Sequence, residues 1–224
     1  MIGLENARDW MSGLGFGVAT AADYEQVSLP AEEVNASAGM PPARRRDFCM
    51  GRAAAHRALL ALGVVDGPIT ATGRAPRFPS GCVGSLSHSQ GVAVAIAATT
   101  DRFCSVGIDL ELDPLPDTAA RLVLGEHEAE WFQRGTRSCA EAFSAKEAAH
   151  KALDPLLAGG APPFRRMQLE PAADGFWLRL PSQPLVEAFV SVRSVAHGVL
   201  AWITVPADHG AALLRGGESS CRRV

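Results

Sequence analysis

The sequence predicts a mixed α/β fold made of two halves of similar size. Helical and strand-like patterns occur both in residues 1–105 and in residues 106–206, and no long linker separates the two ranges. The chain has 224 residues, of which 47% are hydrophobic, so it can build one large core or two small ones. We therefore expect an N-terminal and a C-terminal subdomain that pack together, followed by a flexible tail over residues 207–224.

In the first half, the pattern predicts one long helix and two strands. Residues 43–62 form an amphipathic pattern that begins after two prolines and ends at a glycine, which is typical of a helix. A stretch rich in proline and glycine follows at residues 73–81. Residues 83–87 and 92–98 then read as strands around a turn at residues 88–91.

The second half begins with a strand pattern at residues 102–109, followed by helical patterns and a return to strands. The helical patterns cover residues 117–134 and 137–157. Strand-like runs follow at residues 167–170 and 175–180, and a hairpin is predicted over residues 189–205 with its turn at 196–198.

Composition excludes several classes of protein. The formal net charge of -3 gives no electrostatic reason to expect nucleic-acid binding. The longest apolar run, residues 91–98, is far shorter than the roughly 20 residues of a membrane-spanning helix, and acidic residues near the N-terminus do not fit a secretory signal. Five widely spaced cysteines without a Cys-x-x-Cys pair suit a reducing compartment. We expect a cytoplasmic protein.

The only two lysines, Lys146 and Lys151, lie in one helical stretch, whereas every other basic residue among the 21 Lys and Arg is arginine. A lysine ammonium is a compact point charge on a flexible stem, which suits contact with phosphate or assistance to a proton transfer. Glu147 and Lys151 are four residues apart and therefore share one side of the helix. An ordinary surface ion pair is the alternative interpretation.

An apolar strand pattern ends in two carboxylates, Asp109 and Glu111, whose side chains project from the same face. Magnesium is usually held by one or two carboxylates together with phosphate oxygens and water. Glu147 could complete such a site. Alone, the Asp-x-Glu pair also fits a solvated loop.

The stretch at residues 84–89, Gly-Ser-Leu-Ser-His-Ser, is a third candidate. Backbone amides, hydroxyls and an imidazole at the end of a strand can bind phosphate oxygens. A serine nucleophile assisted by a histidine and an aspartate is the competing catalytic hypothesis for Ser87 and His88. The Gly-x-Ser-x-Gly elbow that often accompanies such a nucleophile is missing from the sequence.

Taken together, the order and spacing of these motifs closely resemble the 4'-phosphopantetheinyl transferases of the surfactin-type and enterobactin-type group. The motifs that carry the resemblance are Leu-Pro-Ala-Glu-Glu at 29–33, Arg-Arg-Arg-Asp-Phe at 44–48, Gly51-Arg52, Pro-Arg-Phe-Pro at 76–79, Gly-Ser-Leu-Ser-His-Ser at 84–89, Val-Gly-Ile-Asp-Leu-Glu at 106–111 and Phe-Ser-Ala-Lys-Glu-Ala-Ala-His-Lys at 143–151. The match covers about residues 29–153.

The resemblance implies a monomeric pseudo-dimer of two similar subdomains, with coenzyme A held between them. The enzyme would transfer the phosphopantetheine arm to a serine of an acyl, aryl or peptidyl carrier protein in a Mg²⁺-dependent reaction that releases 3',5'-adenosine bisphosphate. The implied Mg²⁺ ligands are Asp109, Glu111 and Glu147. The implied catalytic residues are Glu147 and Lys151. The implied coenzyme A contacts are Arg44, Arg45, Arg52, Arg74, Ser87, His88, Lys146 and Lys151.

Two other classes of function stay open at this stage. A catalytically silent homologue would bind coenzyme A or a carrier protein, but it would be expected to have lost one of these carboxylates or a lysine. An unrelated Mg²⁺-dependent phosphotransferase would more often carry a Gly-x4-Gly-Lys-Ser/Thr loop, which the sequence lacks. The histidine at position 150, where the family often has an aromatic residue, leaves the carrier-docking surface undefined.

Overall fold

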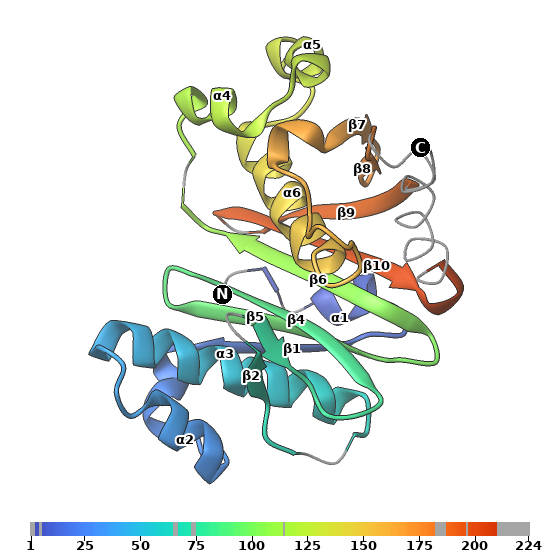
Figure 1. The fold of residues 1–224 in the computed structure, drawn as a ribbon. Coiled ribbons are helices and arrows are strands. Elements are labelled where there is room, and N and C mark those ends of the chain that lie inside the picture. The colour runs from blue at the N-terminus through green and yellow to red at the C-terminus, as the bar shows by residue number, and fades with distance from the viewer. Residues whose placement is uncertain are drawn as a thin grey trace.

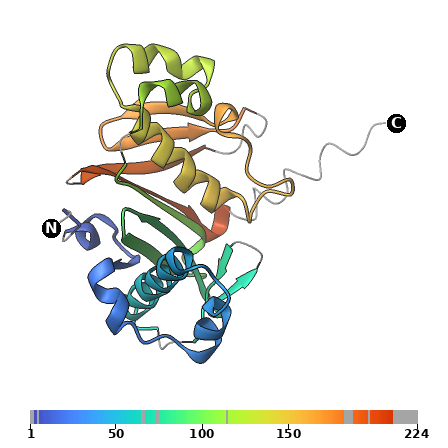
Figure 2. The same ribbon diagram turned by 90° about the vertical axis from the view of Figure 1, so that its left-hand side faces the viewer.

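The computed structural model describes residues 3–4, 6–64, 67–72, 75–113, 115–181, 187–195 and 197–209. These residues form two larger antiparallel sheets, each crossed by one long helix, and a small two-stranded sheet of β2 and β3 (Figure 1). The expected mixed α/β fold is confirmed. In Figure 2 the N-terminal half and the C-terminal half are stacked one above the other. No helix in the described part of the chain is long and apolar enough to cross a membrane.

The first half is a three-stranded sheet of order β1-β5-β4 covered by α3. Its elements are α1 (Ala7–Trp10), β1 (Gly15–Thr20), η1 (Ala21–Gln26), α2 (Ala31–Ser37), α3 (Pro42–Ala61), β2 (Thr70–Thr72), β3 (Ala75–Arg77), β4 (Cys82–Ser89) and β5 (Val92–Thr99). The predicted helix at 43–62 is confirmed as α3. Alanines of β5 face α3, because small side chains let a helix lie close to a sheet.

The turn between β4 and β5 is shorter than predicted. Gln90 and Gly91 both have positive φ, 51° and 73°, as a two-residue hairpin turn requires. His88 and Ser89, which the pattern assigns to the turn, are therefore the last two residues of β4. This correction places His88 on a strand face rather than at a loop tip.

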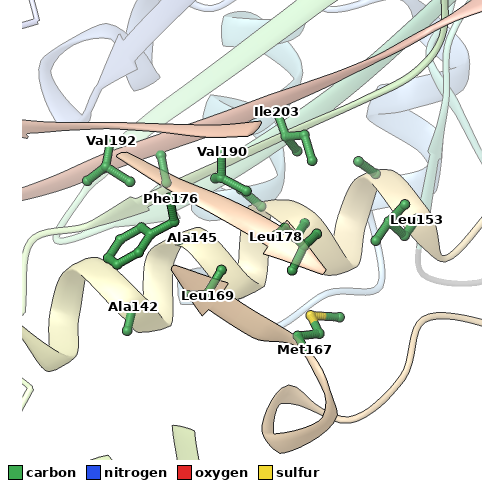
Figure 3. Close-up of a cluster of buried hydrophobic side chains, with 14 of the residues drawn as sticks. Ala142, Ala145, Leu153, Met167, Leu169, Phe176, Leu178, Val190, Val192 and Ile203 are labelled. Atoms are coloured by element: carbon green, nitrogen blue, oxygen red, sulfur yellow. The ribbon is translucent and has the colours of Figure 1, made fainter. Parts of the chain in front are cut away.

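The second half is a five-stranded sheet of order β6-β10-β9-β8-β7 with α6 on one face. Its elements are β6 (Phe103–Glu111), η2 (Asp117–Ala119), α4 (Ala120–Val123), η3 (Glu126–Glu128), α5 (Ala129–Gln133), α6 (Cys139–Leu153), η4 (Phe164–Arg166), β7 (Gln168–Ala172), β8 (Gly175–Arg179), β9 (Glu187–Val195) and β10 (Gly198–Pro206). The predicted hairpin is confirmed as β9 and β10. Figure 3 shows Ala142 and Ala145 of α6 facing Phe176, Leu178 and other apolar side chains of the sheet.

The helix predicted over residues 117–134 is wrong, because the structure divides this range into four short pieces. The chain becomes extended at Leu124 and Gly125. Glu128 turns into the interior, where it accepts hydrogen bonds from the amides of Gly125 and Leu169. Tertiary contacts of one carboxylate therefore override the local helical pattern.

The two sheets meet where β4 lies beside β6, and serine side chains make the contacts there. The amide of Ile108 donates to Ser85 Oγ at 3.2 Å, and the amide of Leu112 donates to Ser89 Oγ at 3.0 Å. Away from α3 and α6, apolar residues of both sheets share a further core, in which Trp10 stacks on Trp202. The turn that links the sheets lies at residues 100–102, and the subdomain boundary at residue 105 stays a prediction. The expected tail at 207–224 falls outside the described residues from residue 210 onward.

Candidate active site

A cleft of about 640 Å³ lies between the two halves. Its first wall is the stretch from β3 into β4, which includes Arg77, Phe78 and Ser85. Its second wall comes from β6 and the end of α6, including Ser105, His150 and Lys151. This volume is in the range of clefts that bind small molecules and cofactors.

Asp109 is a buried residue of β6, and its two carboxylate oxygens differ in their hydrogen bonding. Its Oδ1 accepts hydrogen bonds from Ser87 Oγ and from Lys151 Nζ, both at 2.8 Å. Its Oδ2 is buried, and no described residue donates to it. Because a buried carboxylate oxygen without a partner is costly, this atom fits the first ligand of a cation.

Glu147 faces the same region from α6 and is half-buried. Burial raises the pKa of Glu147, and the charges of Asp109 and Glu111 raise it further, whereas those of Lys151 and His150 oppose the shift. Glu111 accepts hydrogen bonds from the amide of Asp113 at 2.8 Å and from Ser89 Oγ at 3.4 Å. Among the described residues, no three His, Cys, Asp or Glu side chains converge as a ready ligand set for a metal ion.

The two lysines have different surroundings. Lys151 lines the cleft and donates to Asp109 Oδ1 and to the carbonyl of Ile108, at 2.8 and 3.0 Å. Lys146 is 0% exposed, and its ammonium donates to Glu128 and to the carbonyls of Val123 and Phe164. An ammonium group has three hydrogens, so Lys146 has none left for a phosphate. The structure does not bring Lys146 to the cleft, contrary to the expectation for it.

Ser87 and His88 project from opposite sides of β4, because side chains alternate along a strand. Ser87 is buried against Asp109, whereas His88 is exposed. Since Ser87 donates its hydroxyl hydrogen to the aspartate and does not face His88, the arrangement does not fit the serine nucleophile with an adjacent histidine base.

The expected arginine cluster is spread over several environments. Arg44 is exposed at the start of α3. Arg45 donates to the carbonyls of Ser37, Ala38 and Met40, so it holds the segment between α2 and α3. Arg52 is 5% exposed, donates to the carbonyl of Thr70 and lies over the Phe48 ring. Arg74 lies outside the described residues.

Sequence reasoning missed several residues that line the cleft. His150 stands out in the sequence only as a departure from the family pattern, and Asp154 does not stand out at all, yet both lie at the end of α6 on the cleft wall. Phe78 and Arg77 belong to the Pro-Arg-Phe-Pro motif, which could have indicated them. Nothing in the sequence could have indicated that Glu128 is the partner of Lys146, since the contact depends on how the segment between α4 and α5 folds.

Two family models match the chain. The model of the 4'-phosphopantetheinyl transferase N-terminal domain matches residues 31–98, and the model of the 4'-phosphopantetheinyl transferase superfamily matches residues 105–197. Between them they cover most of both halves, and the gap between the two matches, residues 99–104, contains the turn between the sheets. The chain belongs to the 4'-phosphopantetheinyl transferase superfamily.

Three individual relatives are similar to the chain, and two of them are named as 4'-phosphopantetheinyl transferases. The 4'-phosphopantetheinyl transferase Svp of Streptomyces mobaraensis is 36% identical over 61% of this chain and 59% of its own length. The 4'-phosphopantetheinyl transferase Npt of Nocardia iowensis is 41% identical over 51% of this chain and 54% of its own length. Enterobactin synthase component D of Salmonella typhi is 30% identical over 61% of this chain and 59% of its own length. The chain thus spans less than two thirds of the length of these relatives.

Among solved structures, the holo-[acyl-carrier-protein] synthase of Thermotoga maritima is 27% identical, with a TM-score of 0.38. The match covers 46% of this chain and 62% of that chain.

Proposed function

We propose that this protein transfers the 4'-phosphopantetheine arm of coenzyme A to a serine hydroxyl of an apo carrier protein. The carrier's serine oxygen forms a bond to the phosphorus of the arm, the pyrophosphate bond breaks, and 3',5'-adenosine bisphosphate leaves. Membership of the superfamily supports this reaction. The observation that carries it is the cleft between the halves. Lys151 on its wall donates to Asp109, a buried aspartate with one oxygen that has no partner among the described residues.

The carboxylates at the junction fit a Mg²⁺ ion. Asp109 Oδ2 has no hydrogen-bond partner among the described residues and could coordinate the ion. The charge of Asp109 raises the pKa of Glu147, which indicates that the two carboxylates lie in the same region. Two carboxylates suffice, since Mg²⁺ usually takes its other ligands from phosphate and water. Asp109 and Glu147 would hold the ion, with Glu111 beside them. Bound there, Mg²⁺ would neutralise charge that develops on the leaving phosphate.

Lys151 would bind a phosphate of coenzyme A. Two of its three hydrogens bond to Asp109 and to the carbonyl of Ile108, which fixes the direction of the side chain. The third hydrogen has no acceptor among the described residues. Because Lys151 lines the cleft, this hydrogen could be donated to a ligand bound there. A lysine held in this way is pre-organised for an anion, so less rotamer entropy is lost on binding.

Glu147 would accept the proton of the attacking serine. Its place on α6, one turn before Lys151, puts the base and the phosphate-binding amine on one side of the helix.

Coenzyme A would lie along the cleft, with Arg77 and Phe78 on one wall and His150 on the other. Arg44 and His88, both exposed, remain candidates for the phosphates on the adenosine side. We assign Arg45 and Arg52 structural roles instead, because their guanidinium groups bond to backbone carbonyls of neighbouring segments.

The test is intact-mass analysis of a panel of acyl, aryl and peptidyl carrier proteins, from siderophore, peptide, polyketide and fatty acid synthesis, incubated with this protein, coenzyme A and Mg²⁺. We expect one carrier or more to gain the mass of one phosphopantetheine arm. EDTA should abolish the gain, and added Mg²⁺ should restore it. If no carrier gains mass while coenzyme A binding is measurable, the protein is a binding homologue without transfer activity.

A further inference from the structure

The pair Lys146 and Glu128 is buried, charged and outside the cleft. Lys146 Nζ lies 2.5 Å from Glu128 Oε2, and the two side chains are 0% and 1% exposed. Burial lowers the pKa of Lys146, and the charge of Glu128 opposes this shift. No step of the proposed transfer uses either group.

This pair ties several segments to α6. The ammonium also donates to the carbonyl of Val123 at the end of α4 and to that of Phe164 in η4, both at 2.9 Å. The carboxylate accepts from the amides of Gly125 and Leu169. We call this set of contacts around Lys146 and Glu128 the clasp.

The clasp holds the side of α6 that faces away from β6. On the β6 side, Ser144 Oγ donates to the carbonyl of Asp109 at 3.3 Å, and a Cβ on Gly107 would lie 2.0 Å from the carbonyl oxygen of Ala148. Lys146 is two residues from both Ser144 and Ala148, which is about half a helical turn. The helix is therefore fixed from opposite sides, close to Glu147.

We propose that Lys146 and Glu128 are positioning residues that set the rotation of α6, and with it the place of Glu147 relative to Asp109. This inference rests on the proposed transfer reaction, in which Glu147 acts from α6. A buried ion pair adds little stability over an apolar pair of similar volume, but it fixes geometry because its hydrogen bonds are directional. Here the donor and acceptor atoms bond to two further stretches of the chain, residues 123–125 and 164–169.

The test is a double-mutant cycle on kcat with Lys146→Met, Glu128→Gln and the double variant, measured at a temperature where all are folded by circular dichroism. We expect Lys146→Met to lower kcat by about 10- to 100-fold while KM for coenzyme A changes by less than about threefold. The two substitutions should be coupled in kcat, because each breaks the same set of contacts.

The matched control is Leu59→Ala, a substitution of a fully buried residue in α3. It carries a stability cost similar to that of breaking a buried ion pair, but it leaves α6 untouched. We expect its kcat to equal that of the wild type. A folded Lys146→Met protein with wild-type kcat would show that the clasp only stabilises the fold, and would overturn the proposal.

Hydrogen exchange of α6 provides a readout that does not depend on transfer. In Lys146→Met we expect faster exchange at residues 144–151 than in Leu59→Ala, because one of the two attachments of the helix is lost. Equal exchange in the two variants would overturn the positioning role, even if no carrier protein is ever modified. If the wild type transfers nothing but the exchange difference is present, the proposed function is wrong, whereas the proposed positioning of α6 by the clasp is supported.

Discussion

Lys146 and Lys151 are five residues apart, but their identical side chains have different hydrogen-bond partners. Lys151 donates two of its hydrogens to Asp109 and Ile108, and its third has no acceptor among the described residues. Lys146 donates all three to Glu128 and two carbonyls. The sequence indicated that this stretch needs amines. The sequence could not show that the two lysines have different surroundings, because their hydrogen-bond partners come from segments far away in the chain.

The sequence also selected Asp109 and Glu147, whose role as Mg²⁺ ligands stays a prediction. Asp109 and Glu147 come from β6 and α6, and the structure places them within electrostatic reach of each other. The strand-end pattern and the helical spacing were enough to select these residues. Arg45 and Arg52 could not be judged in the same way, since whether a guanidinium faces a ligand or a carbonyl depends on packing that the sequence pattern does not contain.

We predict that Asp109→Asn lowers the rate of transfer by at least about 100-fold, because it removes the charge of the buried carboxylate and leaves an amide next to Lys151. Steady-state kinetics at saturating Mg²⁺ with a responsive carrier protein measure this. Glu130→Gln, at an exposed carboxylate of α5 paired with Arg134, is the control and should retain full activity. If both variants transfer at equal rates, Asp109 is not part of the active site.

At the scale of elements, most strands and long helices followed from periodicity, and the failures have physical causes. β1 was not predicted, and it contains Gly15 and Gly17, a residue type that is depleted in strands. A Cβ at either position would lie 2.0 Å from a carbonyl oxygen of α3, so these glycines are what allow the strand to lie against the helix. The pattern at 117–134 is helical, but the contacts of Glu128 divide it.

We expect Gly107→Ala to separate α6 from β6. The new methyl group would overlap the carbonyl oxygen of Ala148, and overpacking of this kind costs about 1–3 kcal/mol or more. Stability to urea and the rate of transfer should both fall relative to Gly159→Ala, where a new Cβ would meet no atom within 4 Å. A fully stable and active Gly107→Ala protein would contradict the close contact.

Asp23 makes the stability of the first half depend on pH. Hydrogen bonds from Arg57 first, and then from Thr20, lower the pKa of Asp23 from its ordinary 3.8. Since the folded pKa is depressed, the stabilisation is present above pH 3.8 and is lost as the pH falls through the folded pKa.

We therefore predict that Asp23→Ala lowers the free energy of unfolding by about 1 kcal/mol at pH 7, because it removes the carboxylate of the capping box that accepts from the amide of Thr20. The difference from wild type should shrink as the pH falls below 3.8. Urea titrations across this range measure it, with Glu25→Ala at a neighbouring exposed carboxylate as the control. A difference that is the same at pH 7 and at the acid end would exclude the charge of Asp23 as its source.

At the scale of the whole molecule, the proposed transfer takes place where the two halves meet. Ser85, Ser87 and Ser89 of β4 join β6 through their hydroxyls, and one of these contacts ends on Asp109. Each half contributes one wall of the cleft, so neither half is expected to bind coenzyme A alone. The two-part organisation could be predicted from composition and order, whereas the serine contacts between the sheets could not, because nothing local requires β4 and β6 to be neighbours.

The most direct measurement is a crystal structure of the protein with coenzyme A and Mg²⁺, since the central claim is that the coenzyme and the carboxylates meet in the cleft between the halves. We expect density for the pyrophosphate beside Lys151 Nζ and for a cation at Asp109 Oδ2. Coenzyme A in the separate pocket lined by Tyr24 and Cys49, or at the one formed by His127 and Arg165, with no cation at Asp109, would contradict the claim.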